Sequence, residues 1–172
     1  MQLVKHGQMI ADPFVRVADD APVADNAAAL VSADRLVAES EALLSRNGAT
    51  GVIWPNDREL DELVPHLDRL AVVALEFPTF RDGRAYSQAR LLRERFAYRG
   101  ELRATGQVLR DQFMFMLRAG FDSFEVLKNR DAAAFATTAR RYTVFYQPTG
   151  DGRVTALHRR IMERHAAESA SS

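Results

Sequence analysis

Short apolar runs alternate with helix-like segments along most of this chain, and this alternation constrains the fold more than any other feature of the sequence. Most of the runs are rich in β-branched or aromatic residues, which is typical of buried strands. The predicted strands cover residues 51–54, 71–77, 101–104, 123–127 and 143–147. The predicted helical segments cover residues 60–70, which Pro65 interrupts, 86–96, 107–118 and 131–140. One strand and one helix recur about every 20 to 26 residues, which is the size of a βα unit with short loops.

A series of βα units predicts an α/β fold with a mainly parallel sheet. Because crossovers between parallel strands are right-handed, we expect the helices to cover the sheet as outer layers. Two architectures remain open at this point, a doubly wound sheet and a partial TIM-barrel-like sheet. In either one, a functional site is expected at the loops that leave the carboxyl ends of the strands.

The N-terminal part of the chain has a different pattern. Within residues 1–18, short apolar runs are broken at His6–Gly7 and Asp12–Pro13, which favours an N-terminal β-hairpin. Residues 19–31 begin with small and acidic residues and lack a periodic apolar face, so they predict a linker. Ser32 is then a candidate N-cap for a helix.

The length of 172 residues suits one compact unit. We expect a single α/β domain over residues 1–147. The remaining residues, 148–172, contain a short amphipathic stretch followed by small polar residues, and they predict a C-terminal helical tail that is partly disordered.

Charge is unevenly distributed, although basic and acidic residues are equal in number at 23 each. Residues 1–80 contain six basic and thirteen acidic residues, whereas residues 81–118 contain nine arginines and four acidic residues. The overall neutrality argues against nucleic-acid binding, which usually requires a basic excess over the whole domain. The polarised charge instead favours the attraction of an anionic ligand or of a partner protein.

Several classes of chemistry lack the residues that they need. The chain has no cysteine, which excludes disulfides, thiolate nucleophiles and cysteine-ligated iron–sulfur clusters. It also lacks a strand-linked GxGxxG, a phosphate-binding GxxxxGK loop and a GxSxG elbow, and its four histidines show no metal-ligand spacing. We therefore predict no metal and no bound cofactor, and we assign no catalytic residue.

Targeting signals are equally lacking in the sequence. The N-terminus has no continuous apolar region of the kind found in secretory signals, and no run approaches the roughly 18 apolar residues of a membrane span. These observations predict a cytoplasmic protein that does not enter a membrane.

The strongest candidate for a site is the arginine-rich segment that follows the predicted strand 71–77. A guanidinium group is a planar fork of donors that matches carboxylate, phosphate and other oxyanions. Asp82 could hold one arginine in place, Gly83 would allow a positive φ or a close approach to a ligand, and Ser87 would add a hydroxyl at the start of the next helix. The predicted oxyanion-binding residues are Arg81, Asp82, Gly83, Arg84, Ser87 and Arg103, at or near the ends of predicted strands.

The same residues also fit a purely structural interpretation. Asp82–Gly83 is an ordinary turn sequence, and arginines at strand ends can serve structural ion pairs as well as ligands. For Arg81, Arg84 and Arg103 both interpretations stay open. For arginines within the following helix, such as Arg90, a solvated face with local ion pairs is favoured.

Three stretches, FPTFRDGRAYSQARLLRER, GELRATGQVLRDQ and RAGFDSFEV, carry long contiguous motifs. Through them the chain resembles, over about residues 50–147, a bacterial family of unknown function whose members are described as probable oxidoreductases or accessory proteins of sulfite reduction. The resemblance implies a role in assimilatory sulfur metabolism. It also implies a partner, the sulfite reductase haemoprotein, beside which such proteins are typically encoded.

Carried over position by position, the resemblance marks a functional core. This core comprises Phe77, Pro78, Arg81, Asp82, Gly83, Arg84, Tyr86, Ser87, Arg90, Arg93, Gly100, Glu101, Arg103, Gly106, Arg110, Asp111 and Gln112. The chain departs from the family pattern at three positions. Ala85, Gln107 and Ala119 stand where Gly, Asp and Cys respectively are common in the family. A catalytic thiol is therefore not expected here.

Taken together, these features predict a cytoplasmic accessory protein of sulfite reduction that binds a small oxyanion, such as sulfite, sulfate or a phosphorylated relative, at the arginine-rich loop. The residues and the resemblance agree on the oxyanion, whereas no cofactor motif supports an oxidoreductase. One alternative is an enzyme that acts on a phosphorylated or carboxylated small molecule. Another is an oligomerisation or protein-interaction module, including a homo-oligomer, that uses the apolar residues 113–117 or the C-terminal helix.

Overall fold

A computed structural model describes residues 2–126 and 160–162 of the chain. The predicted helix at 131–140, the predicted strand at 143–147 and most of the predicted tail lie outside the described residues. Of the tail, residues 160–162 are helical and exposed.

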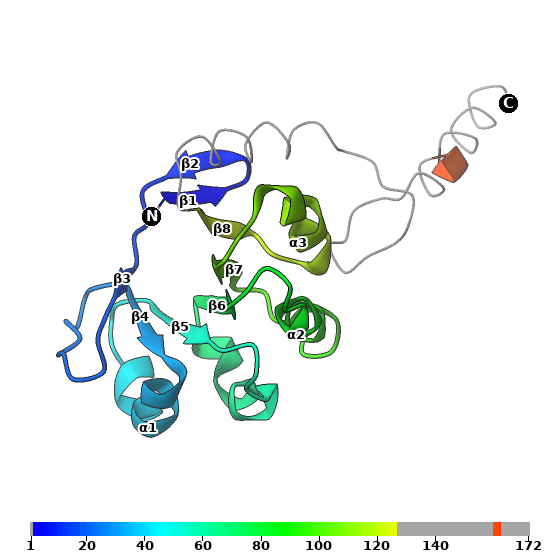
Figure 1. Cartoon of the computed structure of the whole chain (residues 1–172). Coiled ribbons are helices and arrows are strands. Elements are labelled where there is room, and N and C mark those ends of the chain that lie inside the picture. The colour runs from blue at the N-terminus through cyan, green and yellow to red at the C-terminus, as the bar shows by residue number, and fades with distance from the viewer. Residues whose placement is uncertain (1, 127–159, 163–172) are drawn as a thin grey trace, which may run out of the picture.

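One eight-stranded sheet, curled into a half-barrel, organises the described residues (Figure 1). The strands are β1 (Gln2–Lys5), β2 (Gln8–Ile10), β3 (Val15–Arg16), β4 (Ala29–Ser32), β5 (Thr50–Trp54), β6 (Val72–Phe77), β7 (Glu101–Gly106) and β8 (Ser123–Val126). Their order across the sheet is β2-β1-β8-β7-β6-β5-β4-β3, and β3 to β8 pair in parallel. Because these six strands lie in chain order, the sheet winds in one direction. The mainly parallel α/β prediction is confirmed, and the partial barrel is the correct architecture of the two.

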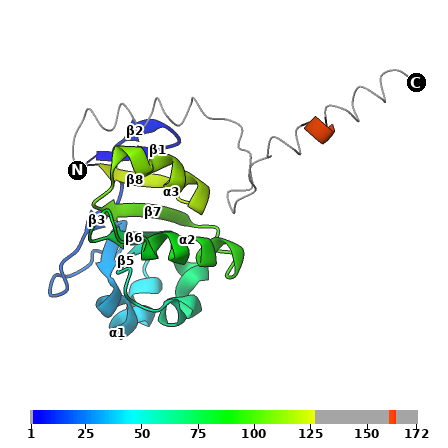
Figure 2. The same ribbon diagram turned by 45° about the vertical axis from the view of Figure 1, so that its right-hand side comes forward.

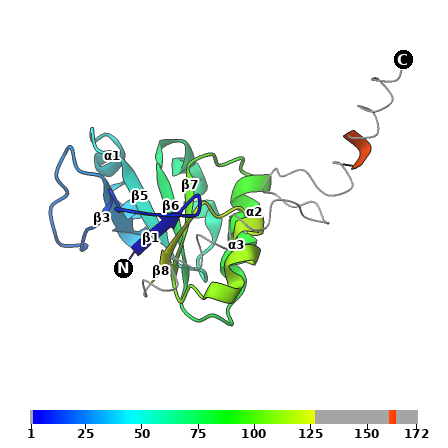
Figure 3. The same cartoon turned by 90° about the horizontal axis from the view of Figure 1, so that it is seen from above.

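Among the described residues, the helices that cover the sheet lie on its convex side (Figures 1 and 2). They are α1 (Ala33–Leu44), η1 (Leu60–Glu62), η2 (Val64–Arg69), α2 (Arg84–Glu94), η3 (Arg110–Gln112) and α3 (Phe113–Ala119), where η denotes a 3-10 helix. Consecutive right-handed crossovers in a sheet that winds one way place every helix on the same side. α2 and α3 contact each other there, and Figure 3 shows them together along one side of the strands.

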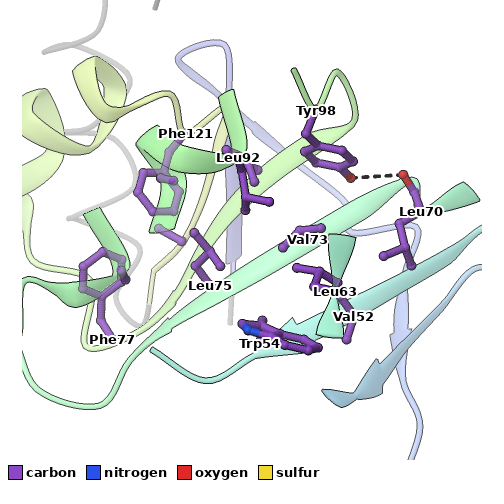
Figure 4. Close-up of a cluster of buried hydrophobic side chains, with 14 of the residues drawn as sticks. Val52, Trp54, Leu63, Leu70, Val73, Leu75, Phe77, Leu92, Tyr98 and Phe121 are labelled. Carbon is purple, nitrogen blue, oxygen red and sulfur yellow. Dashed lines mark hydrogen bonds between the residues drawn. The ribbon is translucent and has the colours of Figure 1, made fainter. Parts of the chain in front are cut away.

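The main core lies between this convex face and the helices (Figure 4). Trp54, Leu75 and Phe77 are fully buried in it, and each comes from the carboxyl-terminal half of a parallel strand. Among the helical residues, Leu92 of α2 is also fully buried. The buried Tyr98 hydroxyl donates a hydrogen bond of 3.1 Å to the Leu70 carbonyl, so the polar end of this ring is satisfied.

The N-terminal hairpin is confirmed by β1 and β2, which pair antiparallel around His6 and Gly7. Both turn residues have positive φ, 50° and 72°, as expected for a two-residue hairpin loop. β1 also pairs antiparallel with β8, where Val4 lies opposite Phe124. The chain then passes to the opposite edge of the sheet to form β3.

The concave face of the sheet changes character from one side to the other. Side chains from β4, β5 and β6 form a small apolar cluster there: Leu30, Ile53, Val72 and Ala74, packed with Phe14. Gly51 belongs to the same face, and a Cβ on it would lie 2.7 Å from Leu30 Cδ2, so the strands approach closely at this point. β7 and β8 instead direct charged and hydroxyl side chains to this face: Glu101, Arg103, Thr105, Ser123 and Glu125.

Three local predictions differ from the structure. β4 occupies residues 29–32, where the sequence predicted the end of a linker. This strand was not predicted because only three small or apolar residues precede the Ser32 cap, and so short a run is not recognisable as a strand. β7 extends to Gly106 rather than ending at Ala104. The helix predicted over 107–118 has its α-helical turns only from Phe113, after the 3-10 turn η3.

None of the helices among the described residues combines the length and the apolarity that crossing a bilayer requires.

Candidate functional site

The carboxyl ends of β5 and β6 form the rim at which a site was expected. β5 ends at Trp54, and the following loop brings Asn56 to the rim. β6 ends at Phe77, and the next residues lead through Asp82 to the start of α2 at Arg84. Because neighbouring parallel strands end at the same edge, these two loops meet.

Asp82 and Arg84 form a tight pair at the start of α2. Arg84 Nη2 lies 2.6 Å from Asp82 Oδ2 and Arg84 Nε lies 3.0 Å from Asp82 Oδ1. Asp82 Oδ1 also accepts the backbone N–H of Arg84 at 3.2 Å. The Arg84 hydrogen bonds hold the pKa of Asp82 well below its usual range, although partial burial opposes this. Asp82 is therefore charged at neutral pH and fixes the direction of the arginine.

Gly83 does not use the backbone freedom that was predicted for it. It is the N-cap residue of α2, with φ −85° and ψ 0°, a conformation open to any residue. A Cβ at this position would meet only a ring atom of Tyr86 at 4.0 Å. Any role of Gly83 in a ligand site would therefore come from the open space beside its backbone.

A cavity of about 430 Å³ lies between the loop after β5 and the N-terminal half of α2. It is lined by Asn56, Asp57, Arg58, Glu59, Leu60, Asp61, Arg84, Ser87, Gln88, Leu91, Arg95 and Phe96. Two of the predicted residues, Arg84 and Ser87, thus share one cavity. We call it the rim cavity.

Two buried amide side chains stand out in the rim cavity. Gln88 Nε2 donates to the backbone carbonyls of Pro55 at 3.1 Å and Arg58 at 2.9 Å, which ties the loop to α2. Asn56 is 5% exposed, and its Nδ2 atom has no hydrogen-bond partner among the described residues. Its amide does lie near enough to Asp82 to lower the pKa of that carboxyl. A buried donor without an acceptor costs free energy, on the order of 1–3 kcal/mol, unless a ligand or water satisfies it.

Arg58 has a structural role at the edge of this cavity. Its guanidinium donates to Asp34 at 2.6 Å and to Glu62 at 2.7 Å, and it lies 5.0 Å from the centre of the Trp54 ring. The hydrogen bonds to Glu62 and Asp34 raise the pKa of Arg58. Both sides of its fork are occupied. Of the other two arginines that line the cavity, Arg84 is held by Asp82, and Arg95 lies over the ring of Phe96, 5.3 Å from its centre.

The other two predicted arginines lie elsewhere. Arg81 stacks over the ring of Phe80, 5.3 Å from its centre, and does not line the rim cavity. Arg103 was expected at a strand end, but it lies inside β7, where it pairs with Ala74 of β6 and is fully buried. The reason is that β7 continues for three more residues, so Arg103 points to the concave face rather than to the rim.

On the concave face Arg103 is surrounded by carboxylates. Its two terminal nitrogens contact the two oxygens of Asp12 at 2.6 and 3.2 Å, and Glu101 and Glu125 accept from it at 3.0 and 3.5 Å. The Phe14 ring lies over the guanidinium, with its centre 5.6 Å away. Burial disfavours the charged form, but the Asp12 and Glu101 carboxylates outweigh burial and raise the pKa of Arg103.

Two further cations complete this concave cluster. Arg16 donates to Glu125 at 2.5 Å and to the Thr105 hydroxyl at 2.7 Å. Lys5 of β1 donates to Glu101 at 2.5 Å. Three cations therefore face three carboxylates in and around the concave face of β7, β8 and β1.

Sequence reasoning missed this cluster, although a signal for it exists. In β7 and β8, polar residues at 101, 103 and 105 and at 123 and 125 alternate with buried apolar ones. Strict alternation indicates two different faces, so polar residues that recur at every second position of an internal strand mark a polar interior face. The contacts of Asp12 and Arg16 with this face carry no such signal.

No group of three or more His, Cys, Asp or Glu side chains among residues 2–126 and 160–162 is arranged to hold a metal ion.

Comparison with known proteins identifies a family to which the sequence is similar. No curated protein and no solved structure matches the chain. The profile of one family, described as a bacterial protein of unknown function (DUF934), matches residues 51–157, which include most of β5, all of β6 to β8, the rim loops and α2. Since the match spans more than half of the chain, the protein belongs to this bacterial family of unknown function.

Proposed function

We propose that the rim cavity binds a small oxyanion and that the protein acts as an accessory protein of assimilatory sulfite reduction. The observation that carries the proposal is the buried Asn56 Nδ2 donor, which lacks a partner and lines the same cavity as Arg84 and Ser87. An anion with several acceptor oxygens would satisfy this donor. The same ligand would take hydrogen bonds from the Ser87 hydroxyl and a guanidinium.

The geometry of Arg84 supports this role. Asp82 accepts from Arg84 Nε and Nη2, so Nη1 is the nitrogen left without a contact to Asp82. The arginine is thereby held in one orientation before a ligand arrives, which lowers the entropy that binding would cost. The first turn of α2, which carries Arg84 and Ser87, adds the positive end of the helix dipole.

The carboxylates of the loop set the expected selectivity. Asp57, Glu59 and Asp61 also line the cavity, so its cationic character is local to the α2 side. Asp82 and, more weakly, Asp57 raise the pKa of Arg84, so both carboxylates lie close to it. A compact anion against Arg84 and Asn56 would meet less repulsion from them than a large polyanion would. This favours an ion of the size of sulfite, sulfate or phosphate over a polyphosphate.

The link to sulfite reduction rests on the motif around FPTFRDGR and its resemblance to proteins described as accessory to that pathway. Among the oxyanions proposed for the cavity, sulfite is the substrate of the haemoprotein. We therefore propose that the protein presents or retains sulfite close to the reductase.

Titration calorimetry with sodium sulfite, sulfate and phosphate tests the proposed site. Arg84→Gln should weaken binding at least about tenfold, the loss expected for one charge-assisted hydrogen bond. Asn56→Ala should weaken binding with little change in the thermal midpoint, because Asn56 Nδ2 has no hydrogen-bond partner among the described residues and only lies near Asp82.

Arg90→Gln is the matched control. Arg90 lies on the same helix, pairs with Glu94 at 3.4 Å and does not line the cavity. Equal losses of anion affinity in Arg84→Gln and Arg90→Gln would mean that the loss reflects net charge rather than a specific contact of Arg84. Absence of binding by the unaltered protein, both alone and with the haemoprotein present, would refute the proposal.

A second candidate function, contact with a partner protein, is favoured by α3. The apolar run at 113–117 is not wholly buried: Phe113 and Met116 are buried, but Phe115 is 67% exposed. A large exposed aromatic side chain on α3 is a candidate anchor for a protein interface. Phe115→Ser should abolish co-elution with the haemoprotein in gel filtration while leaving anion binding intact. Unchanged co-elution would exclude α3 as the contact, and a shift in self-association instead would point to a homo-oligomer.

A further inference from the structure

Three carboxylates contact Arg103 on the concave face, and one of them differs from the other two in how it is held. Glu101 and Glu125 belong to the paired strands β7 and β8. Asp12 belongs to the segment between β2 and β3, and 30% of its side chain is exposed. Residues 12–16, which include β3, lie over the concave face and are here called the strap.

The strap is attached to the charged half of the sheet by ion pairs at its two ends. Asp12 makes the two-pronged contact with Arg103, and Arg16 contacts Glu125 and Thr105. Between them, the Phe14 ring covers the guanidinium. Two backbone groups give further support: Phe14 N–H donates to Asp12 Oδ1 and Val15 N–H to the Ala28 carbonyl, each at 3.0 Å.

The charge balance of the concave cluster depends on Asp12. Lys5, Arg16 and Arg103 balance three carboxylates, so loss of the Asp12 carboxylate would leave one positive charge in excess beside a fully buried guanidinium. A buried excess charge is costly unless a counter-charge replaces it. The cluster therefore requires a carboxylate at this position, but nothing in the geometry requires that it come from the chain itself.

A cavity of about 280 Å³ lies next to the Asp12 carboxylate. Leu3 and Phe14 provide an apolar lining, and Gln2, Asp12, Arg16 and Glu125 provide a polar one. The Gln2 Oε1 atom is buried and has no donor among the described residues. The cavity suits a short aliphatic chain, and Gln2 could accept from a hydroxyl or amino group on it.

We propose that the concave face is a second binding site, specific for a small carboxylate, and that Asp12 occupies the carboxylate position in the absence of ligand. The ligand carboxylate takes the fork of Arg103, and its short chain lies in the cavity against Leu3 and Phe14. The Asp12 side chain leaves the fork when the ligand enters, while Arg16 keeps its contact with Glu125 and Phe14 stays beside the ligand. This site shares no residue with the rim cavity, so either can exist without the other.

The test titrates propionate, a carboxylate with a short apolar chain, into the unaltered protein and into Asp12→Ala. Without the internal competitor, Asp12→Ala should bind propionate at least about tenfold more tightly, as expected when a charge-assisted contact is made available. Propionate should also raise the thermal midpoint of Asp12→Ala more than sodium chloride does at equal ionic strength. Asp19→Ala is the matched control, since Asp19 accepts from Ser32 outside the cluster. Equal propionate affinity in the unaltered protein and in Asp12→Ala would overturn the proposal.

Two further measurements keep the test decisive. Adding Arg103→Met to Asp12→Ala should abolish propionate binding. If Asp12→Ala does not fold, Asp12→Asn replaces it in every measurement, because asparagine removes the charge and keeps the size of the side chain. In the unaltered protein, saturating propionate should accelerate amide hydrogen exchange at Phe14, whose N–H donates to Asp12 Oδ1. A purely structural ion pair would leave exchange in the strap unchanged or slower, and that result would also overturn the proposal.

Discussion

The two faces of the curled sheet are made by the same strands but are stabilised in different ways. The convex face is apolar across its width and is covered by helices. The concave face is apolar only over β4 to β6 and carries a balanced set of charges over β7, β8 and β1. Burial of apolar area tolerates changes that preserve volume, whereas a buried charge cluster tolerates only changes that preserve neutrality. One face therefore depends on packing and the other on charge balance.

The largest expected effect belongs to the convex face. Trp54→Ala removes a fully buried ring from the main core and should lower the free energy of unfolding by about 4 kcal/mol. Urea denaturation at low and at high salt measures it. The loss should be the same at both salt concentrations, because a cavity is not screened; a strong salt dependence would contradict the view that this face depends on packing.

Arg103→Met tests the concave face, and we expect a loss of about 3 kcal/mol, since the change leaves buried carboxylates without their partner. Adding Asp12→Asn should recover part of this loss by restoring neutrality. No such recovery is expected when Asp12→Asn is combined with Trp54→Ala. If Asp12→Asn deepens the loss in the Arg103→Met protein, charge balance is not what stabilises this face.

Acid should weaken the concave face first. Burial tends to raise the pKa of Glu101, but hydrogen bonds from Lys5 and Ser123 outweigh it, and the net pKa lies below the ordinary value of 4.5. A carboxyl with a lowered folded-state pKa adds stability above its unfolded pKa, and this contribution is lost as the pH falls below about 4.5 through the folded value. Urea midpoints measured from neutral pH downward should fall less steeply in Glu101→Gln. Glu41→Gln, an exposed carboxylate on α1, should not change the slope.

A smaller effect is expected at Ser32, where β4 ends and α1, on the convex side of the sheet, begins. The Ser32 hydroxyl accepts the Arg35 N–H at 3.1 Å and caps α1. Ser32→Ala should cost about 1 kcal/mol, and Ser32→Asp should retain most of the stability because an aspartate can accept the same bond. Thermal unfolding of the pair measures this. Equal losses in both variants would mean that the cap itself contributes little.

The smallest effect is expected on the exposed surface of α2. Arg90 and Glu94 form a pair of 3.4 Å with more than 45% of each side chain exposed. Arg90→Ala should change the free energy of unfolding by no more than about 0.5 kcal/mol. A loss as large as that of Arg103→Met would show that exposed arginines of this segment are not the solvated face that the sequence predicts.

Much of the fold could be predicted because its signals are local. The runs at 51–54 and 71–77 are apolar, bounded by turn residues and spaced as βα units, and each became a parallel strand. The hairpin around His6–Gly7 was equally clear, since its turn lies between two short apolar runs. β4 was not predicted because its apolar run is too short to distinguish from the helix that follows it.

The residues of the candidate site also differ in whether their neighbours are local or distant in sequence. Asp82, Arg84 and Ser87 lie within one short segment, so their proximity could be read from the sequence. Arg103 could not be placed, because its position depends on where β7 ends and on a contact with Asp12, 91 residues away in sequence. Pairs at such separations leave no local pattern in a single sequence.

The pairing of β1 with β8 has a consequence for how the chain folds as it is synthesised. β1 leaves the ribosome well before β8, its antiparallel neighbour, because β8 is the last in sequence of the parallel strands that the structure describes. The hairpin must therefore wait, with only its local pairing, until residues 123–126 have emerged. Contacts of such long sequence separation close late and slowly, so the N-terminal strands act as the closing step of the sheet rather than as its nucleus.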